Sequence, residues 1–255
     1  MRQVQLRGTV ALAGREVRRV LSLWTQTIVP PVVTGVLFLA IFGGALGGRI
    51  REIEGLDYSS FVLPGLLVLT VTGQAFANNS TSLFQAKTEG YVEDVLTSPI
   101  RAWQLALAYM SGGVVRSLLA ALALAVVATP FVEGPSSPAL AAAALLLAAL
   151  VFSALGVIVG MWAGSFDQHA FVANLVITPL ALVAGVFYSP RMLGEPWATL
   201  TRVDPLYYLV DVTRAGTAGP HEASIALSLA IAAAVAVLTF MAAAALLARG
   251  WRLKP

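Results

Sequence analysis

Few residues in this chain have the types and spacing that chemistry would need. Ser165 and His169 lie four positions apart at a predicted turn, where a hydroxyl nucleophile could meet an imidazole base. The sequence around them has no nucleophile elbow, and Ser165-Phe-Asp-Gln168 matches a capping box that begins a helix. A structural role therefore explains Ser165 better than a hydrolase site does.

Carboxylates gather in one polar stretch, 49–57, which contains Glu52, Glu54 and Asp57. At a loop tip, a solvated surface is a simpler interpretation of such a group than acid–base chemistry. The chain has no cysteine and two histidines, and it contains no Gly-x-x-x-x-Gly-Lys-Ser/Thr segment for nucleotide phosphates. We expect no catalytic residue, no metal and no cofactor on this chain, so energy for uphill transport must come from elsewhere.

One substantial charged segment, 85–101, separates two long apolar runs. Within it, 88–98 is predicted to form a short helix with Gly90 as N-cap, acidic residues in its first turn and Pro99 as its stop. Because this helix lies between two membrane spans, its apolar face has no membrane to enter, and we expect it to dock in a groove of another protein. The residues predicted to make this contact are Glu89, Gly90, Tyr91, Val92, Glu93, Asp94, Val95, Leu96 and Pro99, with the apolar face formed by Tyr91, Val92, Val95 and Leu96.

The rest of the chain has the composition of a protein that spans a membrane. Of its 255 residues, 58% are hydrophobic and 11% are charged, and the mean hydropathy is +0.82. The net charge of +3 comes from basic residues at the ends of apolar runs rather than along one face. That placement indicates membrane topology and lipid as the surroundings, and it argues against nucleic acid as a partner.

We predict an all-α polytopic membrane protein, a single transmembrane domain over 1–255 with six transmembrane helices. The spans are predicted at 27–46, 59–84, 103–131, 139–162, 169–188 and 223–248, each long enough for a hydrocarbon core of about 30 Å. Residues 1–24 are predicted to form an amphipathic helix in the membrane interface, and a plain basic flank that sets orientation is the alternative. With the N-terminus inside and Arg116 left aside, ten Lys and Arg residues fall on the inner side and five on the outer, which favours N-in and C-in.

Polar residues in the second span and a charge in the third are the intramembrane candidates. Thr70, Gln74, Asn78 and Asn79 need partners away from lipid. Two interpretations remain open for them: they line a substrate path, or they form hydrogen bonds between helices. Arg116 is the one charge well inside an apolar run, which by default marks a functional site. The alternative is that Arg116 lies one turn inside the membrane boundary and extends outward to water.

Proline and glycine divide 189–216 into pieces too short to span, before the last apolar run. One piece is predicted to be helical, with Asp204 as N-cap and Pro205 in its first position, followed by Tyr208. We expect surface or re-entrant helices here, at the outer leaflet.

Taken in order, these stretches resemble the membrane subunit of type-2 ABC transporters, the bacterial permeases that export drugs, polysaccharides and nodulation factors. The resemblance covers nearly the whole chain. It is carried by the basic amphipathic start and by Phe61-Val-Leu-Pro-Gly-Leu66, Glu89-Gly-Tyr-Val-Glu-Asp-Val-Leu-Thr-Ser-Pro99, Gly112-Gly113 with Arg116, Thr178-Pro-Leu, Gly185-Val-Phe-Tyr188 and Asp204-Pro-Leu-Tyr-Tyr-Leu209. Glu89 departs from the family pattern, which usually has a basic residue there, and Asp204 stands where asparagine is common.

The resemblance implies a coupling helix at 88–98, between spans two and three, and re-entrant helices at 189–216, before span six. It also implies a homodimer in the bacterial cytoplasmic membrane, working with a separately encoded ABC-type ATP-binding subunit that binds ATP and Mg²⁺. The expected function is export of a hydrophobic or amphipathic substrate, such as a drug, a lipid or a glycolipid. A stand-alone secondary carrier or a membrane scaffold is the alternative.

Overall fold

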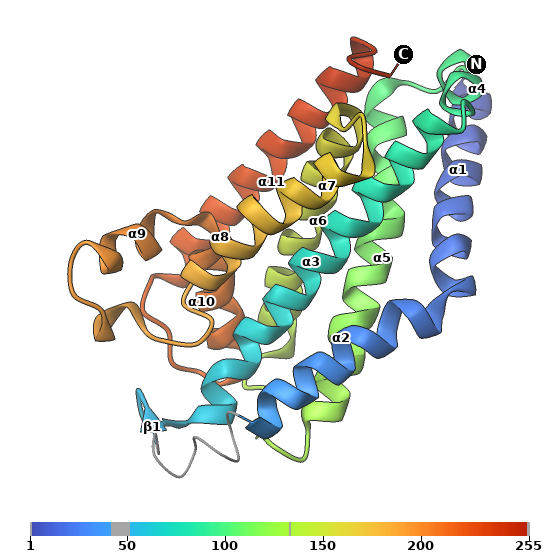
Figure 1. The fold of residues 1–255 in the computed structure, drawn as a ribbon. Coiled ribbons are helices and arrows are strands. Elements are labelled where there is room, and N and C mark those ends of the chain that lie inside the picture. Colours follow the sequence, from blue (N-terminus) through green and yellow to red (C-terminus); the bar gives the residue numbers. More distant parts are fainter. Residues whose placement is uncertain (1, 42–51, 133, 254–255) are drawn as a thin grey trace.

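The structure is a computed structural model that describes residues 2–41, 52–132 and 134–253, and these residues are almost entirely helical (Figure 1). The long helices are α1 (Arg2–Ser22), α2 (Trp24–Leu39), α3 (Tyr58–Thr88), α5 (Ala102–Ala128), α6 (Pro138–Trp162) and α11 (Ile225–Ala248). The shorter helices are α4 (Val92–Thr97), α7 (Phe166–Val172), α8 (Thr178–Val183), α9 (Trp197–Val203) and α10 (Pro205–Thr217), with a π-helical turn η2 (Ala173–Ile177) and a 3-10 turn η3 (Pro190–Met192). The strands are β1 (Glu52–Ile53) and β2 (Leu56–Asp57). This is the all-α fold that the sequence predicted.

Five stretches of the described chain are helical, long and apolar enough to cross a membrane: Tyr58–Thr88, Ala102–Ala128, Pro138–Trp162, Phe166–Val183 and Ile225–Ala248. A sixth crossing arises if Gln3–Ser22 and Trp24–Leu39, which meet at a bend of 61°, form one broken span. Residues 42–46 of the first predicted span lie outside the described residues.

The long helices run side by side as one bundle, and α1 begins at the end where α11 finishes (Figure 1). A shared end is what six spans with both termini on one side require. We call it the α4 end, because α4 also lies there, and we call the opposite end the hairpin end, after β1 and β2.

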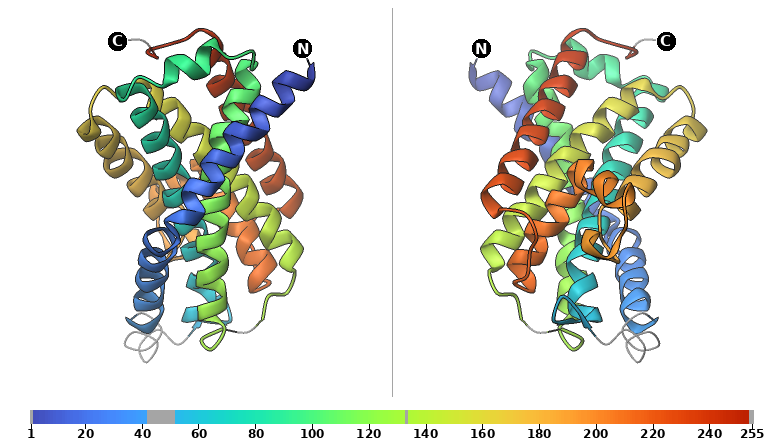
Figure 2. Two further views of the ribbon diagram at one scale, coloured as in Figure 1. Left: turned by 90° about the vertical axis from the view of Figure 1, so that its right-hand side faces the viewer. Right: turned by 90° about the vertical axis from the view of Figure 1, so that its left-hand side faces the viewer.

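The N-terminal helix α1 packs along α5 as part of the bundle (Figure 2). Leu12, Glu16 and Val20, one helical turn apart, are buried, whereas Leu6 and Val10 are exposed. The helix therefore uses a stripe that contains an acidic residue to pack against its own chain. Part of its apolar surface, including Leu6 and Val10, is left uncovered, as a surface directed at lipid would be.

Small residues bring α3 and α6 close together in the centre of the bundle. A Cβ atom at Gly156 would lie 2.7 Å from the Phe76 carbonyl oxygen, and one at Gly160 would lie 2.8 Å from the Ser80 carbonyl oxygen. A side chain at either position would clash with the α3 backbone, so this four-residue spacing of glycines serves helix packing.

The span predicted at 169–188 is built from three consecutive pieces, α7, η2 and α8. Ser165 Oγ accepts a hydrogen bond from the Gln168 amide at 3.3 Å and caps α7, as the sequence predicted. The helix widens into η2 just before Thr178-Pro179. Proline has no amide hydrogen to donate, which accounts for a break in the α-helical pattern at this point.

The stretch predicted as a polar loop contains a small hairpin, in which β1 pairs antiparallel with β2. Glu54 and Gly55 form its turn with φ of +54° and +78°. Asp57 caps α3 by accepting a hydrogen bond from the Ser59 amide at 3.1 Å, and Glu54 accepts one from Ser189 Oγ at 2.7 Å. Glu52, Glu54 and Asp57 are all exposed, as the prediction of a solvated surface requires, and two of them, Glu54 and Asp57, also hold local structure.

Helix α10 packs against α6, α11 and α3 towards the hairpin end (Figure 1). Asp204 Oδ1 accepts a hydrogen bond from the Leu206 amide at 2.9 Å, and Pro205 is the first helical residue, as predicted. The Tyr208 hydroxyl donates to the Arg202 carbonyl oxygen at 3.0 Å and so fastens α10 to the end of α9. The expected short helices before the last span are present in the structure.

Candidate functional site

The predicted coupling segment lies between α3 and α5 at the α4 end of the bundle (Figure 1). Gly90 has a φ of +83°, and its amide donates to the Lys87 carbonyl oxygen at 3.3 Å, the geometry of a glycine that ends a helix. The prediction that Gly90 is the N-cap of the short helix is therefore wrong. Gly90 ends α3, Tyr91 occupies the cap position, and α4 begins at Val92. Pro99 follows the end of α4, as predicted.

The two faces of α4 have opposite characters. Val92 is 2% exposed and belongs to a core cluster built from α1, α3, α5, α6 and α11, against which Tyr91, Val95 and Leu96 are partly buried. In this structure the predicted apolar face is thus directed at the chain's own bundle. The exposed positions are Glu89, Gly90, Glu93, Asp94, Thr97 and Pro99, so the surface open to a partner is acidic.

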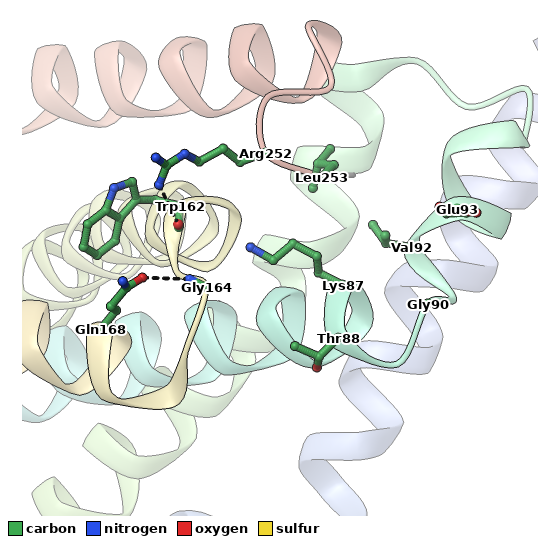
Figure 3. Close-up of a pocket in the computed structure, with 10 residues that line it drawn as sticks. All are labelled: Lys87, Thr88, Gly90, Val92, Glu93, Trp162, Gly164, Gln168, Arg252 and Leu253. Carbon is green, nitrogen blue, oxygen red and sulfur yellow. Dashed lines mark hydrogen bonds between the residues drawn. The ribbon is translucent and has the colours of Figure 1, made fainter. Parts of the chain in front are cut away.

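A cavity of about 620 Å³ lies between α4 and the ends of α6 and α11 (Figure 3). Lys87 Nζ donates to the carbonyl oxygens of Met161, at 3.0 Å, and Ala163. Arg252 Nη1 donates to the Trp162 carbonyl oxygen at 3.2 Å. These two cations satisfy carbonyl groups that the last turn of α6 leaves unpaired.

The segment that follows α11 completes the wall of this cavity. Leu253 is 1% exposed and belongs to the same core cluster as Val92, and Figure 3 shows both side chains at the cavity. The coupling segment is thus fastened to the C-terminal segment as well as to α3 and α6.

A buried ion cluster joins α1 to α3 close to α4. Glu16 is 2% exposed and accepts hydrogen bonds from Arg15 Nη2 at 2.9 Å, Arg19 Nη2 at 3.0 Å and Ser82 Oγ at 2.7 Å. Two guanidinium partners offset the cost of burying this carboxylate. Glu16 is not among the residues predicted from the sequence, although an acid with arginines at i−1 and i+3 is a signal for such a cluster.

The ion cluster also touches the coupling segment. The Arg15 guanidinium lies over the Tyr91 ring, 5.6 Å from its centroid. Burial, with Glu89 adding to it, raises the pKa of the Tyr91 hydroxyl, which stays neutral at physiological pH. A cavity of about 360 Å³ separates Glu16 and Ser82 from Asp94. A displacement of α4 would therefore act directly on α1 and α3.

Two of the four predicted path residues hold helices together. Asn79 accepts a hydrogen bond from the Gly113 amide and donates one to the Ser153 carbonyl oxygen, both at 3.1 Å. Asn78 donates to Asn79 Oδ1 at 3.0 Å and accepts from Arg19 Nη2 at 3.2 Å. Both asparagines are buried. These contacts favour interhelical hydrogen bonding as the role of this pair.

The other two path residues lie on a less covered face of α3. Thr70 and Gln74 are half-buried, and Gly73 between them is exposed. Gln74 Oε1 accepts a hydrogen bond from Arg116 Nε at 2.8 Å. Arg116 stands near the middle of α5 and is half-buried. Its hydrogen bond to Gln74 joins α5 to α3.

Ser165 and His169 do not form a catalytic pair. The serine hydroxyl caps α7, and the buried imidazole stacks on Phe76, with ring centroids 5.9 Å apart. Across the described parts of the chain, no group of three or more His, Asp or Glu side chains could hold a metal ion.

Comparison with known proteins defines the class of this chain. Residues 7–217 match the model of the ABC-2 type transporter family, and the chain belongs to that family. It is a transport permease, a multi-pass inner membrane protein and not an enzyme, and membership implies an ABC ATP-binding partner.

Named relatives support this assignment. The chain is 32% identical to the inner membrane transport permease YadH of Escherichia coli K12 over 238 residues, 93% of each protein. Nodulation protein J of Rhizobium meliloti is 25% identical over 223 residues, which cover 86% of this chain and 84% of that protein. Nodulation protein J of Neorhizobium galegae is 24% identical over 216 residues, or 84% and 82% of the two chains.

Proposed function

We propose that this chain is the permease subunit of an ATP-driven exporter for a hydrophobic or amphipathic substrate. It works as a homodimer, and ATP and Mg²⁺ bind to a separate subunit on the cytoplasmic side, which is the α4 end. The observation that carries the proposal is α4 itself, a short helix fixed to the bundle by its apolar face that presents Glu89, Glu93 and Asp94 outward. A separate ATP-binding subunit needs such an exposed and firmly packed helix in order to transmit movement to the permease.

Two contacts of α4 can transmit a movement of this helix to the spanning helices. The buried Val92 side chain transmits it to the core cluster of α3, α5 and α6. The Tyr91 ring under Arg15 transmits it to α1, which Glu16 links back to α3 through Ser82. Both routes begin on the same short helix, so α4 moves its neighbours together.

The ion cluster argues against a proton-driven carrier that uses Glu16. Such a carrier needs a carboxylate that can take up and release a proton during transport. Both carboxylate oxygens of Glu16 are occupied by arginine or serine donors from α1 and α3. Glu16 is therefore engaged in holding these two helices together.

The uncovered face of α3 supports the homodimer. Thr70 and Gln74 lie within a spanning helix but are not fully covered by their own chain. Polar groups at membrane depth need protein or water around them. A second copy that meets this face would supply both the cover and a polar path between the subunits.

The acidic face of α4 provides the test. In Glu93→Lys/Asp94→Lys, two exposed carboxylates become cations, and we expect the permease to lose both capture of the ATP-binding subunit from its native cells and stimulation of ATP hydrolysis. Asp167→Lys reverses one exposed charge at the start of α7 and should retain both. If the double variant remains monodisperse and captures the ATPase as the wild type does, α4 is not the contact.

A further inference from the structure

A second cavity lies away from α4 and is almost wholly apolar. It measures about 300 Å³ and is bounded by α3, α6, η2, α8, α10 and α11, with Phe76, Phe152 and Leu209 among its walls and Asp204 as its one titratable lining residue. A neighbouring cavity of about 530 Å³ between α8 and α9 shares Val176, Leu180, Asp204 and Pro205 with the first. Cavities of this size suit small-molecule ligands, which typically occupy roughly 300–1,000 Å³.

Asp204 stands where the two cavities meet and is itself 5% exposed. One of its carboxylate oxygens, Oδ1, accepts the capping hydrogen bond from the Leu206 amide. The other, Oδ2, is buried without a hydrogen-bond partner among the described residues. Capping α10 uses one oxygen of this carboxylate, and the isolation of the other among apolar walls is unfavourable unless a hydrogen-bond donor or a positive group joins it.

We propose that the Asp204 cavities bind a lipophilic cation, in which an apolar body fills the walls and a single positive charge pairs with the Asp204 carboxylate. For transport this inference rests on the proposed exporter function, and it names the substrate class. Binding itself is a property of the permease chain and needs no partner.

The position of the cavities fits a ligand that arrives from the lipid. Val176 and Leu180 line both cavities and are 43% and 37% exposed on the surface of a spanning stretch. A cation with a large apolar body concentrates in the membrane and can enter beside these residues. Anions of the same shape have no positive group in the cavity walls to receive them.

The charge of Asp204 makes binding depend on pH. Asp204 lies between α9 and α10, outside the spanning helices, and burial raises the pKa of its carboxyl to about 6. The cation should therefore bind well above pH 6, where the carboxylate is ionised, and binding should weaken as the pH falls through 6.

The other charged or titratable groups on the elements around Asp204 are engaged elsewhere or exposed. Asp211 accepts the Glu222 and Ala223 amides, and Arg214 donates to the Gly185 and Phe61 carbonyl oxygens. Arg202 is exposed on α9, and the rings of Tyr207 and Tyr208 on α10 meet edge to face. His169 on α7 stacks on Phe76, a residue of the cavity wall. Helices α6 and α11 carry no charged residue.

Equilibrium dialysis of the purified permease with radiolabelled tetraphenylphosphonium tests the proposal, with protein-free micelles as the blank. Asp204→Asn keeps the size and the helix cap but removes the charge, and we expect it to bind the cation at least about tenfold more weakly. Asp167→Asn removes an exposed carboxylate and should bind as the wild type does. Tetraphenylborate, an anion of the same shape, should show no saturable binding.

Equal binding of the phosphonium and the borate, or unchanged binding in a monodisperse Asp204→Asn, would overturn the proposal. If that variant does not fold, the wild type at pH 7.5 and pH 5 decides, because tetraphenylphosphonium keeps its charge and only the protein titrates. If the wild-type permease captures the ATP-binding subunit but does not bind tetraphenylphosphonium, only the proposed substrate class is overturned. Loss of ATPase capture with intact cation binding overturns the coupling proposal alone.

Discussion

The buried carboxylate of Glu16 allows a direct measurement of how firmly α1 is held to the bundle. In Glu16→Gln the side chain keeps its shape but loses its charge. An amide nitrogen, which donates hydrogen bonds, replaces one of the carboxylate oxygens that accept them from Arg15, Arg19 and Ser82. Arginine has no acceptor to offer, so at least one guanidinium must lose its hydrogen bond. The perturbation therefore breaks the link between Arg15, Arg19 and Ser82 without opening a cavity.

The expected magnitude follows from how deeply each partner is buried. Breaking a fully buried ion pair costs about 3–5 kcal/mol, whereas an exposed pair contributes about 0–1 kcal/mol. Glu16 is 2% exposed, but the Arg15 and Arg19 side chains are 44% and 33% exposed, so water can partly rehydrate them. We therefore expect a loss of about 2–3 kcal/mol in the free energy of unfolding, between the two limits.

Unfolding by sodium dodecyl sulfate in mixed micelles, followed by circular dichroism, measures this loss. Glu52→Gln changes an exposed carboxylate of β1 and should stay within about 0.5 kcal/mol of the wild type. Arg19→Gln completes a double-mutant cycle, in which the two changes together should cost clearly less than their sum. Additive costs, or a Glu16→Gln protein as stable as the wild type, would show that the cluster does not hold α1.

Two further predictions concern α3. Gly156→Ala places a Cβ 2.7 Å from the Phe76 carbonyl oxygen and is expected to destabilise the protein by about 1–3 kcal/mol in the same unfolding assay, whereas Gly73→Ala, with no atom within 4 Å of the new Cβ, should not. Gly73→Cys in this cysteine-free chain is expected to give a disulfide-linked dimer on oxidation in membranes. Leu238→Cys, 65% exposed on α11, should stay monomeric, and the opposite pattern would place the subunit interface at α11 instead.

The sequence could predict where α4 lies but not which way it faces. Breakers at Gly90 and Pro99 and the charges between them mark a short helix between two apolar runs. An apolar face looks the same in sequence whether it packs on its own bundle or on a partner. The choice is made by residues far along the chain, because Val92 shares its core cluster with Leu105 and Leu253.

Polar residues inside the spans show the same limit. Their number in the second span predicts that they face protein rather than lipid. Their partners depend on helix packing, since Asn79 bonds to Ser153, 74 residues away. The buried position of Glu16 could not be predicted from the sequence for a similar reason, because its serine partner lies 66 residues further along the chain. Asp204 was identified as a helix cap, whereas the isolation of its second oxygen arises only when α10 packs beside η2 and α8.

Two rigid helices connect the coupling segment with the Asp204 cavity. Helix α3 contributes Leu83 to the core cluster around Val92 and Phe76 to the cavity wall. Helix α6 contributes Met161 to that cluster and Phe152 to the same wall. The close approach of α3 and α6 at their glycines packs these two helices tightly on each other. A shift of α4 would therefore act on α3 and α6, and the same two helices carry walls of the Asp204 cavity, so energy from the partner subunit has a path through packed helices to a bound cation.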